Sequence, residues 1–302
     1  MTSSSISPGA DAGDGGPGGR GVPEEPAGLL SWGRRYLVCP PSHFGVLYEI
    51  NPWMHKEVAV DPDRARTQWE DMVANLESAG AVTVPMEPVA GLPDLVFTAN
   101  AGLIHANRFV VSRFRHTERR PEARHNAEWF ARAGYQVDEV PVELGVCFEG
   151  AGDALPFRGR LVAGYRFRSD FVAHGALAEL LGIPVVSVEL ADARFYHLDL
   201  TFCPLDDRRA ICAPHAWDRY ARAVMERLVP EPLVLEPDEA MSFCANSVVV
   251  NHTIVMPACP PRVGRILERW GFDVCVSPVG EFMKAGGGVR CLTLALDVTL
   301  GQ

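Results

Sequence analysis

The C-terminal part of the sequence carries the pattern with the clearest chemical potential. Three consecutive glycines, Gly286, Gly287 and Gly288, come shortly before Cys291 in the segment GEFMKAGGGVRCLTLAL. Because glycine tolerates positive φ and close backbone approach, this run could aim Cys291 into a cleft and leave room for a ligand. Neighbouring backbone groups could also stabilise the thiolate, which is the nucleophilic form of cysteine. Taken alone, the same pattern more often marks a flexible loop that leads to a buried strand cysteine.

A second pattern combines a histidine with a carboxylate. His197 and Asp199 stand two residues apart in the apolar segment RFYHLDLTF, which reads as a strand. In a strand, residues two apart project to the same face. A lone histidine there is usually a satisfied core residue, but this pair could combine a general acid or base with a carboxylate that holds a cation such as a guanidinium.

A third pattern places two carboxylates beside glycines. In CFEGAGDAL, Glu149 and Asp153 flank Gly150 and Gly152 within an otherwise apolar stretch. Carboxylates beside glycines usually mark turns. If Glu149 is buried, however, we expect a raised pKa that would let it shuttle protons during guanidinium chemistry.

Polar residues in two further segments complete the candidate set. In DLVFTANAGLI, Asp94 stands at the start of a predicted strand and Asn100 follows its end. In YEINPWM, Asn51 precedes a proline, and Trp53 should anchor the surrounding loop. Each asparagine taken alone reads as a turn former.

The elements that must position these residues alternate between helix and strand. Five helical stretches show apolar residues at three- and four-residue spacing, and four of them end on glycine, a common helix stop. Each is followed by a short apolar strand, so that a helix and strand unit recurs roughly every fifty residues. The five helical segments are PDRARTQWEDMVANLESAG, PEARHNAEWFARAG, VAHGALAELLG, WDRYARAVMERL and PRVGRILERWG.

Five copies of one unit indicate an α/β fold with internal pseudo-symmetry. A doubly wound nucleotide-binding sheet would also alternate helix with strand. The sequence has no G-x-G-x-x-G or P-loop motif after its first strand, which disfavours that fold.

Composition limits the classes of partner and site. The net charge of -10 and the pI near 5.4 argue against nucleic acid or an anionic membrane as partner, because phosphates would be repelled, and suit a small cationic substrate better. The cysteines are scattered singly, without a C-x-x-C pair, so we expect neither disulfides nor a structural zinc site. The eight are Cys39, Cys147, Cys203, Cys212, Cys244, Cys259, Cys275 and Cys291.

The N-terminal residues differ in composition from the rest of the chain. Residues 1–28 are rich in Gly, Ser, Pro and Asp and contain almost no large apolar side chain. Such a segment buries too little surface to offset the entropy of ordering it, so we expect a disordered tail and a single catalytic domain over residues 29–302. The tail resembles neither a secretory signal nor a transit peptide, and no later stretch is long enough to span a bilayer, so we expect a cytoplasmic protein.

The motifs, in their order, resemble a known superfamily. FTANAG, FEGAGD, GYRFRS, YHLDLTF and KAGGGVRCLTL follow one another as in the guanidino-group-modifying enzymes, or penteins, which include arginine deiminases, dimethylargininases and arginine dihydrolases. The resemblance spans about residues 34–297. It implies a five-bladed α/β propeller with pseudo-fivefold symmetry, a guanidino substrate, and catalysis without cofactor or metal.

The resemblance also implies a role for each motif residue. Cys291 is the expected nucleophile, His197 the general acid or base, and Glu149 the acid that contacts the guanidinium and relays protons. Arg168, in GYRFRS, matches the arginine that grips the substrate carboxylate. Asp199 matches the carboxylate that deiminases place against the unsubstituted guanidinium nitrogens, which favours unmethylated arginine; Asp153 and Asp94 join the expected substrate-binding set.

Two departures from the superfamily pattern narrow the assignment. Deiminases and dimethylargininases carry Asp where this sequence has Asn100, and their Glu is three positions before the Gly-Asp aspartate, whereas Glu149 is four before Asp153. The alignment of Glu149 with the superfamily's Glu is therefore offset by one position. Arginine dihydrolases share both an Asn in the FTANAG context and the INPWM element at Asn51, and this sequence resembles them most.

The expected reaction is a thiolate attack on arginine. Cys291 attacks the guanidinium carbon, ammonia leaves as His197 protonates it, and water hydrolyses the covalent thiouronium. In a dihydrolase the ureido product is attacked again and yields ornithine, carbon dioxide and a second ammonia. The alternatives are a dimethylargininase, an arginine deiminase, an amidinotransferase and, outside enzymes, a catalytically silent propeller that acts as a binding module.

Overall fold

The computed structural model describes residues 28–300. Residues 1–27, which make up nearly all of the predicted N-terminal tail, lie outside the described part. Among residues 28–300, no helix is both long and apolar enough to cross a bilayer.

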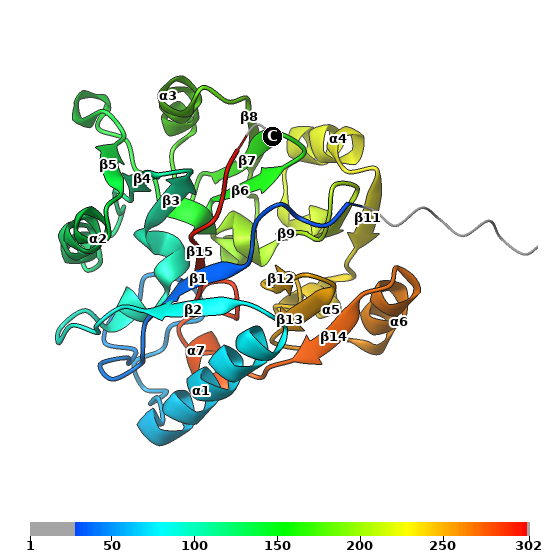
Figure 1. Ribbon diagram of the computed structural model, residues 1–302, viewed down its shortest axis with the longest axis horizontal. Helices are drawn as coiled ribbons and strands as arrows, with labels where there is room; N and C mark the ends of the chain where they lie inside the picture. Colours follow the sequence, from blue (N-terminus) through cyan, green and yellow to red (C-terminus); the bar gives the residue numbers. More distant parts are fainter. Residues whose placement is uncertain (1–27, 301–302) are drawn as a thin grey trace, which may run out of the picture.

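Five small sheets of three strands each form the framework. In every sheet an antiparallel pair is extended by a third strand that runs parallel to the middle one. Figure 1 shows the sheets following one another around the molecule in chain order. Four sheets comprise β3 (Gly102–His105), β4 (Arg108–Val111) and β5 (Gln136–Glu139); β6 (Ala154–Phe157), β7 (Arg160–Tyr165) and β8 (Val185–Glu189); β9 (Phe202–Pro204), β10 (Arg209–Cys212) and β11 (Glu231–Val234); and β12 (Val248–Val250), β13 (Thr253–Met256) and β14 (Asp273–Val276).

The fifth sheet joins the two ends of the described chain. Its strands are β15 (Leu294–Ala295), β1 (Arg35–Val38) and β2 (Val82–Pro85), with β15 antiparallel to β1. The Asp297 carboxylate reinforces this junction, because it accepts hydrogen bonds from the backbone N–H groups of Gly33 at 3.0 Å and Arg34 at 2.7 Å. The segment that carries Cys291 is thereby fixed against the first strand of the chain.

One helix crosses from the middle strand of each sheet to its parallel neighbour, as a parallel pair requires. These crossovers are α1 (Pro62–Ser78), α2 (Arg120–Arg132), α3 (Phe171–Leu181), α4 (Arg219–Leu228) and α6 (Pro261–Arg269), and short helices lie at α5 (Pro237–Met241) and α7 (Gly280–Met283). The five predicted helix and strand units are therefore confirmed. Glycines with positive φ follow four of the helices, as the sequence predicts: Gly80, Gly134, Gly182 and Gly271.

Helix α1 illustrates how the sequence sets these boundaries. Asp61 lies in an extended conformation, and its carboxylate accepts hydrogen bonds from the N–H groups of Asp63 and Arg64, both at 3.1 Å. Pro62 occupies the first helical turn, where its missing N–H costs nothing.

Short 3₁₀ turns precede the first strand of three sheets and pack against one another. They are η2 (Thr98–Ala101) before β3, η4 (Gly150–Gly152) before β6 and η6 (Leu198–Leu200) before β9. Turn η2 contacts η4, and η4 contacts η6. The remaining turns are η1 (Pro93–Val96), η3 (Val142–Leu144), η5 (Ala193–Phe195) and η7 (Pro214–Ala216).

Two strand predictions are wrong at these turns. Asp94 and Asn100 lie in η1 and η2, so that Asn100 precedes a strand rather than following one. His197 lies directly before η6 and Asp199 lies within it, so the two residues do not share one face of a strand. The Asp153 carboxylate accepts a hydrogen bond from the Leu198 N–H at 3.1 Å. This bond holds the turn, and it occupies the N–H that would otherwise pair with a neighbouring strand.

Candidate active site

The predicted site residues converge on one cavity at the turns that begin the sheets. The space within it and its open mouth together amounts to about 270 Å³. Six predicted residues line it: Asn51, Asp94, Asn100, Arg168, His197 and Cys291. Glu149 and Asp199 stand directly behind this wall, each bonded to a lining side chain.

Cys291 lies at the wall of the cavity with a buried sulfur. Its thiol donates a hydrogen bond to Asp199 Oδ2 at 3.3 Å. Burial, and then the Asp199 charge, raise the pKa of Cys291 well above its ordinary value, although a backbone N–H from Gly288 and the Asn246 amide oppose the rise. Burial likewise raises the pKa of Asp199 to about 7. The resting nucleophile is therefore a protonated thiol beside a carboxyl that exchanges its proton near neutral pH.

The glycine run before Cys291 has the geometry that its sequence predicts. Gly286 has a φ of +84°, a conformation that disfavours any other residue. A Cβ on Gly287 would lie 2.3 Å from the Phe97 ring, and one on Gly288 would lie 2.6 Å from the side-chain oxygen of Asn246. The run therefore turns the chain and lets the backbone pass close to both side chains, which excludes larger residues.

Glu149 links the candidate acid or base to an arginine. Its Oε2 accepts hydrogen bonds from His197 Nε2 at 2.8 Å and from Arg168 Nη1 at 3.1 Å. Burial alone would raise the pKa of Glu149, but the Arg168 charge and the His197 bond hold it well below the ordinary value. The raised pKa expected from burial is thus corrected: Glu149 is a fixed anion that can stabilise protonated His197.

Asp153 occupies a supporting position. It accepts hydrogen bonds from Ser169 Oγ at 2.6 Å and from the Leu198 N–H, and its side chain is not among the described groups that line the cavity. Burial raises its pKa to about 6. Its contacts hold the turn that carries His197, in place of the substrate contact that the sequence predicts.

A buried ion-pair network that the sequence reasoning missed lies behind Asn100. Arg119 lines the cavity, donates to Asn100 Oδ1 at 2.9 Å and pairs with Glu122 at 2.8 Å. Burial disfavours the Arg119 charge, but Glu122 and Asp94 outweigh this effect and raise its pKa. In the sequence HTERRPEAR these residues read as a solvated charge run, so only their burial in the folded chain reveals the network.

One carboxylate oxygen in the site lacks a partner. Among the described residues, Asp199 Oδ1 is buried and accepts no hydrogen bond, whereas the Asp94 carboxylate has the Tyr48 hydroxyl beside it. A buried carboxylate oxygen without a donor is costly, which is typical of a position where a cationic ligand completes the hydrogen bonds. The cavity is thus prepared for a group with several N–H donors, as a guanidinium has.

The loop that carries Asn51 closes one side of the cavity. Arg168 Nη2 donates to the Ile50 carbonyl at 3.0 Å, and Asn51 Nδ2 donates to the Ala285 carbonyl at 3.0 Å. Trp53 Nε1 donates to the Arg194 carbonyl at 2.8 Å, which confirms its predicted anchoring role. The loop is therefore tied both to the arginine and to the segment that leads to the nucleophile.

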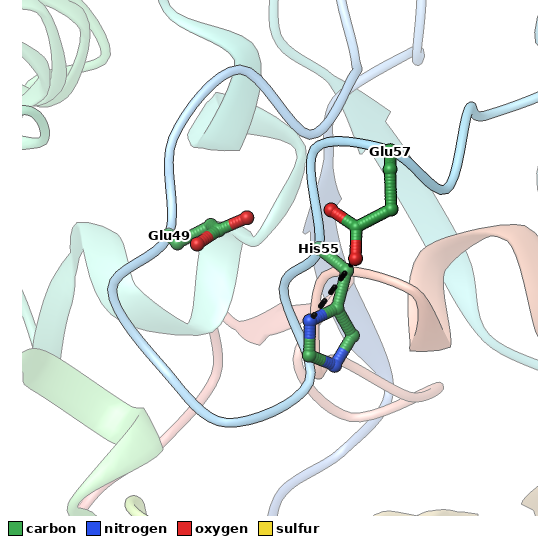
Figure 2. Close-up of side chains that lie close together, drawn as sticks. All are labelled: Glu49, His55 and Glu57. Carbon is green, nitrogen blue, oxygen red and sulfur yellow. Dashed lines mark ion pairs between the residues drawn. The ribbon is translucent and has the colours of Figure 1, made fainter.

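One cluster of potential metal ligands lies in the same loop, on the solvent side. Glu49, His55 and Glu57 are exposed, and His55 Nδ1 lies 4.0 Å from Glu57 Oε1 (Figure 2). None of the three lines the cavity among the residues described. All eight cysteines are free thiols, which agrees with the expectation of no disulfides.

Similarity to known proteins assigns the family. Residues 49–298 match the family described as N,N dimethylarginine dimethylhydrolase, eukaryotic. The chain belongs to this dimethylargininase family. A dimethylargininase-family relative, the N(G),N(G)-dimethylarginine dimethylaminohydrolase of Mycobacterium tuberculosis, is 39% identical over 87% of this chain and 86% of its own length.

Arginine dihydrolases are also similar to this dimethylargininase-family chain, at somewhat higher identity. The bifunctional arginine dihydrolase/ornithine cyclodeaminase AgrE of Nostoc sp. is 44% identical over 86% of this chain, which spans only 37% of AgrE. The crystal structure of the N-terminal domain of ArgZ, a cyanobacterial arginine dihydrolase, bound to its substrate has a TM-score of 0.84. It is 40% identical over 88% of this chain and 98% of that domain. Membership of the family therefore does not distinguish a methylated from an unmethylated substrate, and the residues of the site must do so.

Proposed function

We propose that this chain is an arginine dihydrolase that converts arginine and two water molecules into ornithine, carbon dioxide and two ammonia molecules. We further propose that residues 29–302 form one catalytic domain, a five-bladed propeller in which the five sheets are the blades. The five equivalent sheets and the β1–β15 junction support the propeller. The observation that favours a dihydrolase is that two neutral amides, those of Asn51 and Asn100, line the same cavity as Cys291.

The first half of the reaction uses the charged groups of the site. The arginine guanidinium donates to the unpartnered oxygen of Asp199, and its positive charge next to the sulfur favours transfer of the thiol proton to Asp199 Oδ2, which accepts the hydrogen bond of the thiol. The thiolate attacks the guanidinium carbon to form a C–S bond. His197 protonates the departing nitrogen, which leaves as ammonia, and the Glu149 anion stabilises the imidazolium before and during that transfer.

Water then attacks the thiouronium carbon, and His197 accepts its proton. The C–S bond breaks and returns its electron pair to sulfur, and the hydroxyl proton of the adduct passes to the thiolate, which leaves citrulline in the cavity and restores the Cys291 thiol. The ureido group of citrulline is neutral and has a carbonyl oxygen where arginine had a donor. Holding it for a second attack requires hydrogen-bond donors, which carboxylates cannot supply when ionised.

Asn51 and Asn100 can supply these donors. Asn100 Oδ1 accepts from Arg119 at 2.9 Å, and its Nδ2 donates to the Glu149 carbonyl at 3.3 Å, so the orientation of the amide is fixed by an obligatory donor and an obligatory acceptor. The Asn51 amide is fixed in the same way by the Trp53 N–H and the Ala285 carbonyl. Each amide nitrogen keeps one N–H uncommitted to any described residue, and that N–H is available to a ureido oxygen.

Dimethylarginine hydrolysis is the second candidate, and the family match favours it. The position of Asp199 argues for the unmethylated substrate. Its carboxylate lies 3.3 Å from the sulfur, where it would face the nitrogens of the attacked guanidinium. An unsubstituted nitrogen offers that carboxylate N–H donors, whereas a dimethylated nitrogen offers none.

The role of Asn100 is tested by Asn100→Asp. The new carboxylate can pair with Arg119 and still attract a guanidinium, so the first attack should survive. It offers no donor to the citrulline carbonyl, so citrulline should escape. We expect the ornithine-to-citrulline ratio to fall about tenfold or more, the effect of losing one hydrogen bond of about 1.4 kcal/mol, while arginine consumption falls less.

Asn100→Ala is the matched control, because it removes the donor without adding charge. It should also release citrulline, with slower consumption of arginine. Mass spectrometry of the products gives both quantities. An unchanged ornithine-to-citrulline ratio in both variants would remove Asn100 from the second half of the reaction.

A further inference from the structure

Asn246 lies in the turn that leads into β12. Neither the proposed mechanism nor the sequence motifs assign a role to this turn. The other four sheets each contribute a proposed site residue from the turn before the strand that pairs antiparallel with the middle strand: Asn100, Glu149, His197 with Asp199, and Cys291. Asn246 stands at the corresponding place, two residues before β12, and is fully buried. Its segment, FCANSVVV, reads as an ordinary turn before a strand, which explains why the sequence reasoning passed over it.

The Asn246 side chain bridges the nucleophile and the backbone of Asp199, whose carboxylate lies beside the sulfur. Its Nδ2 donates to Cys291 Sγ at 3.1 Å and to the Asp199 carbonyl at 3.2 Å, and its Oδ1 accepts the Cys291 N–H at 3.2 Å. Its own backbone carbonyl accepts the Arg290 N–H at 3.2 Å. One amide thus holds both the backbone and the sulfur of Cys291.

The orientation of this amide follows from its partners. A backbone N–H can only donate and a backbone carbonyl can only accept, so Oδ1 must face Cys291 N and Nδ2 must face Asp199 O. The second hydrogen of the same nitrogen is the one directed at the sulfur. The sulfur therefore has an N–H donor in place before any substrate arrives.

We infer that Asn246 is a further catalytic residue, which donates a hydrogen bond to the Cys291 thiolate and orients it for attack. A charge-assisted bond to a thiolate is stronger than the bond to a neutral thiol, so the donor favours the ionised form. This effect counters the two influences that disfavour the thiolate, burial and the Asp199 charge. Gly288 makes the contact possible, since any Cβ there would collide with the amide oxygen.

The ionisation of Cys291 is the direct readout. Four charged or titratable groups surround it. Asp199 acts on it electrostatically, and the Cys291 charge in turn acts on Tyr196. His197 lines the same cavity, and the charge of the preceding residue, Arg290, acts on Asp199. Iodoacetamide alkylation of Cys291 in substrate-free protein, followed by peptide mass spectrometry across a pH series, reports its apparent pKa. Tryptic cleavage after Arg290 places Cys291 in a peptide that contains none of the other seven cysteines.

For Asn246→Ala we expect the apparent pKa of Cys291 to rise by about 1 and kcat for arginine to fall about tenfold or more. KM should change less, because Asn246 is not among the described side chains that line the cavity. Asn246→Asp retains the shape and the acceptor for Cys291 N–H but points a second acceptor at the sulfur. It should raise the apparent pKa of Cys291 further than alanine does.

Ser247→Ala is the matched control. It removes the neighbouring buried bond from Ser247 Oγ to the Cys244 carbonyl at 2.7 Å without touching the sulfur, and should leave the alkylation profile unchanged. If Asn246→Ala fails to fold, the nearly isosteric Asn246→Asp carries the test. A wild-type alkylation profile in Asn246→Asp, or a milder change than in Asn246→Ala, would overturn the donor role.

The turnover measurements rest on the proposed function, whereas the alkylation profile does not. If the wild-type protein consumed no arginine, the proposed function would fail and the alkylation result would still decide the role of Asn246.

Discussion

Replacing Cys291 with serine should abolish arginine turnover while the protein stays folded. We expect kcat to fall by at least about a thousandfold, because a hydroxyl ionises far less readily than a thiol and no neighbouring group can take over the covalent step. The change is nearly isosteric at a buried position, so thermal unfolding should move little. Calorimetry and ornithine release measure the two effects on the same preparation.

The control is another cysteine. Cys259 lies in the loop that leads to α6, partly buried and outside the set of described residues that line the cavity. Cys259→Ser should keep wild-type turnover. Activity of Cys291→Ser within tenfold of wild type would remove Cys291 from the mechanism.

The second large effect is a gain of stability at the expense of activity in Asp199→Asn. The pKa of Asp199 is about 7 in the folded protein, against about 4 in an unfolded chain. Between these pH values the folded protein holds a proton that the unfolded chain has released, so this carboxyl lowers the free energy of unfolding as the pH rises from about 4 to about 7. The loss is on the order of 4 kcal/mol above pH 7, at 1.36 kcal/mol for each pKa unit.

An asparagine has no proton to release, so Asp199→Asn escapes this loss. The difference in free energy of unfolding, Asp199→Asn minus wild type, should increase by a few kcal/mol between pH 4.5 and 7.5. Arginine turnover by the variant should fall more than about a hundredfold. Urea unfolding at each pH measures the difference. Asp238→Asn, at an exposed carboxylate in the first turn of α5, should show no such trend. A flat or decreasing difference for Asp199→Asn would contradict the buried, partly protonated state of this carboxyl.

The fold was predictable because its signals are local. Helix periodicity marks the five crossovers, terminal glycines mark four of them, and each apolar run that follows them pairs as a strand. The errors at Asn100 and His197 arose where a short apolar run fits strand and 3₁₀ turn equally well. Tertiary bonds decide there: Asp153, more than forty residues before Leu198, captures the backbone N–H that a strand would have used.

The site was predictable where motifs are contiguous and not where partners are distant in sequence. Glu149 was expected to have a raised pKa from burial alone, but Arg168 and His197 fold against it and reverse the direction. Arg119 and Asn246 carry no local signal, since a charge run and a turn asparagine are common on any surface. Their burial, and the atoms they touch, are properties of the folded chain.

The most direct test of the proposed function is the stoichiometry of products from wild-type protein given arginine alone, with dimethylarginine and citrulline in parallel reactions. A dihydrolase gives one ornithine and two ammonia molecules for each arginine consumed, with little free citrulline, and no dimethylamine above background from dimethylarginine. Ornithine and ammonia in this ratio, measured by mass spectrometry and an ammonia assay, are the result that we predict. Citrulline accumulating with a single ammonia, or turnover of dimethylarginine without turnover of arginine, would contradict the assignment.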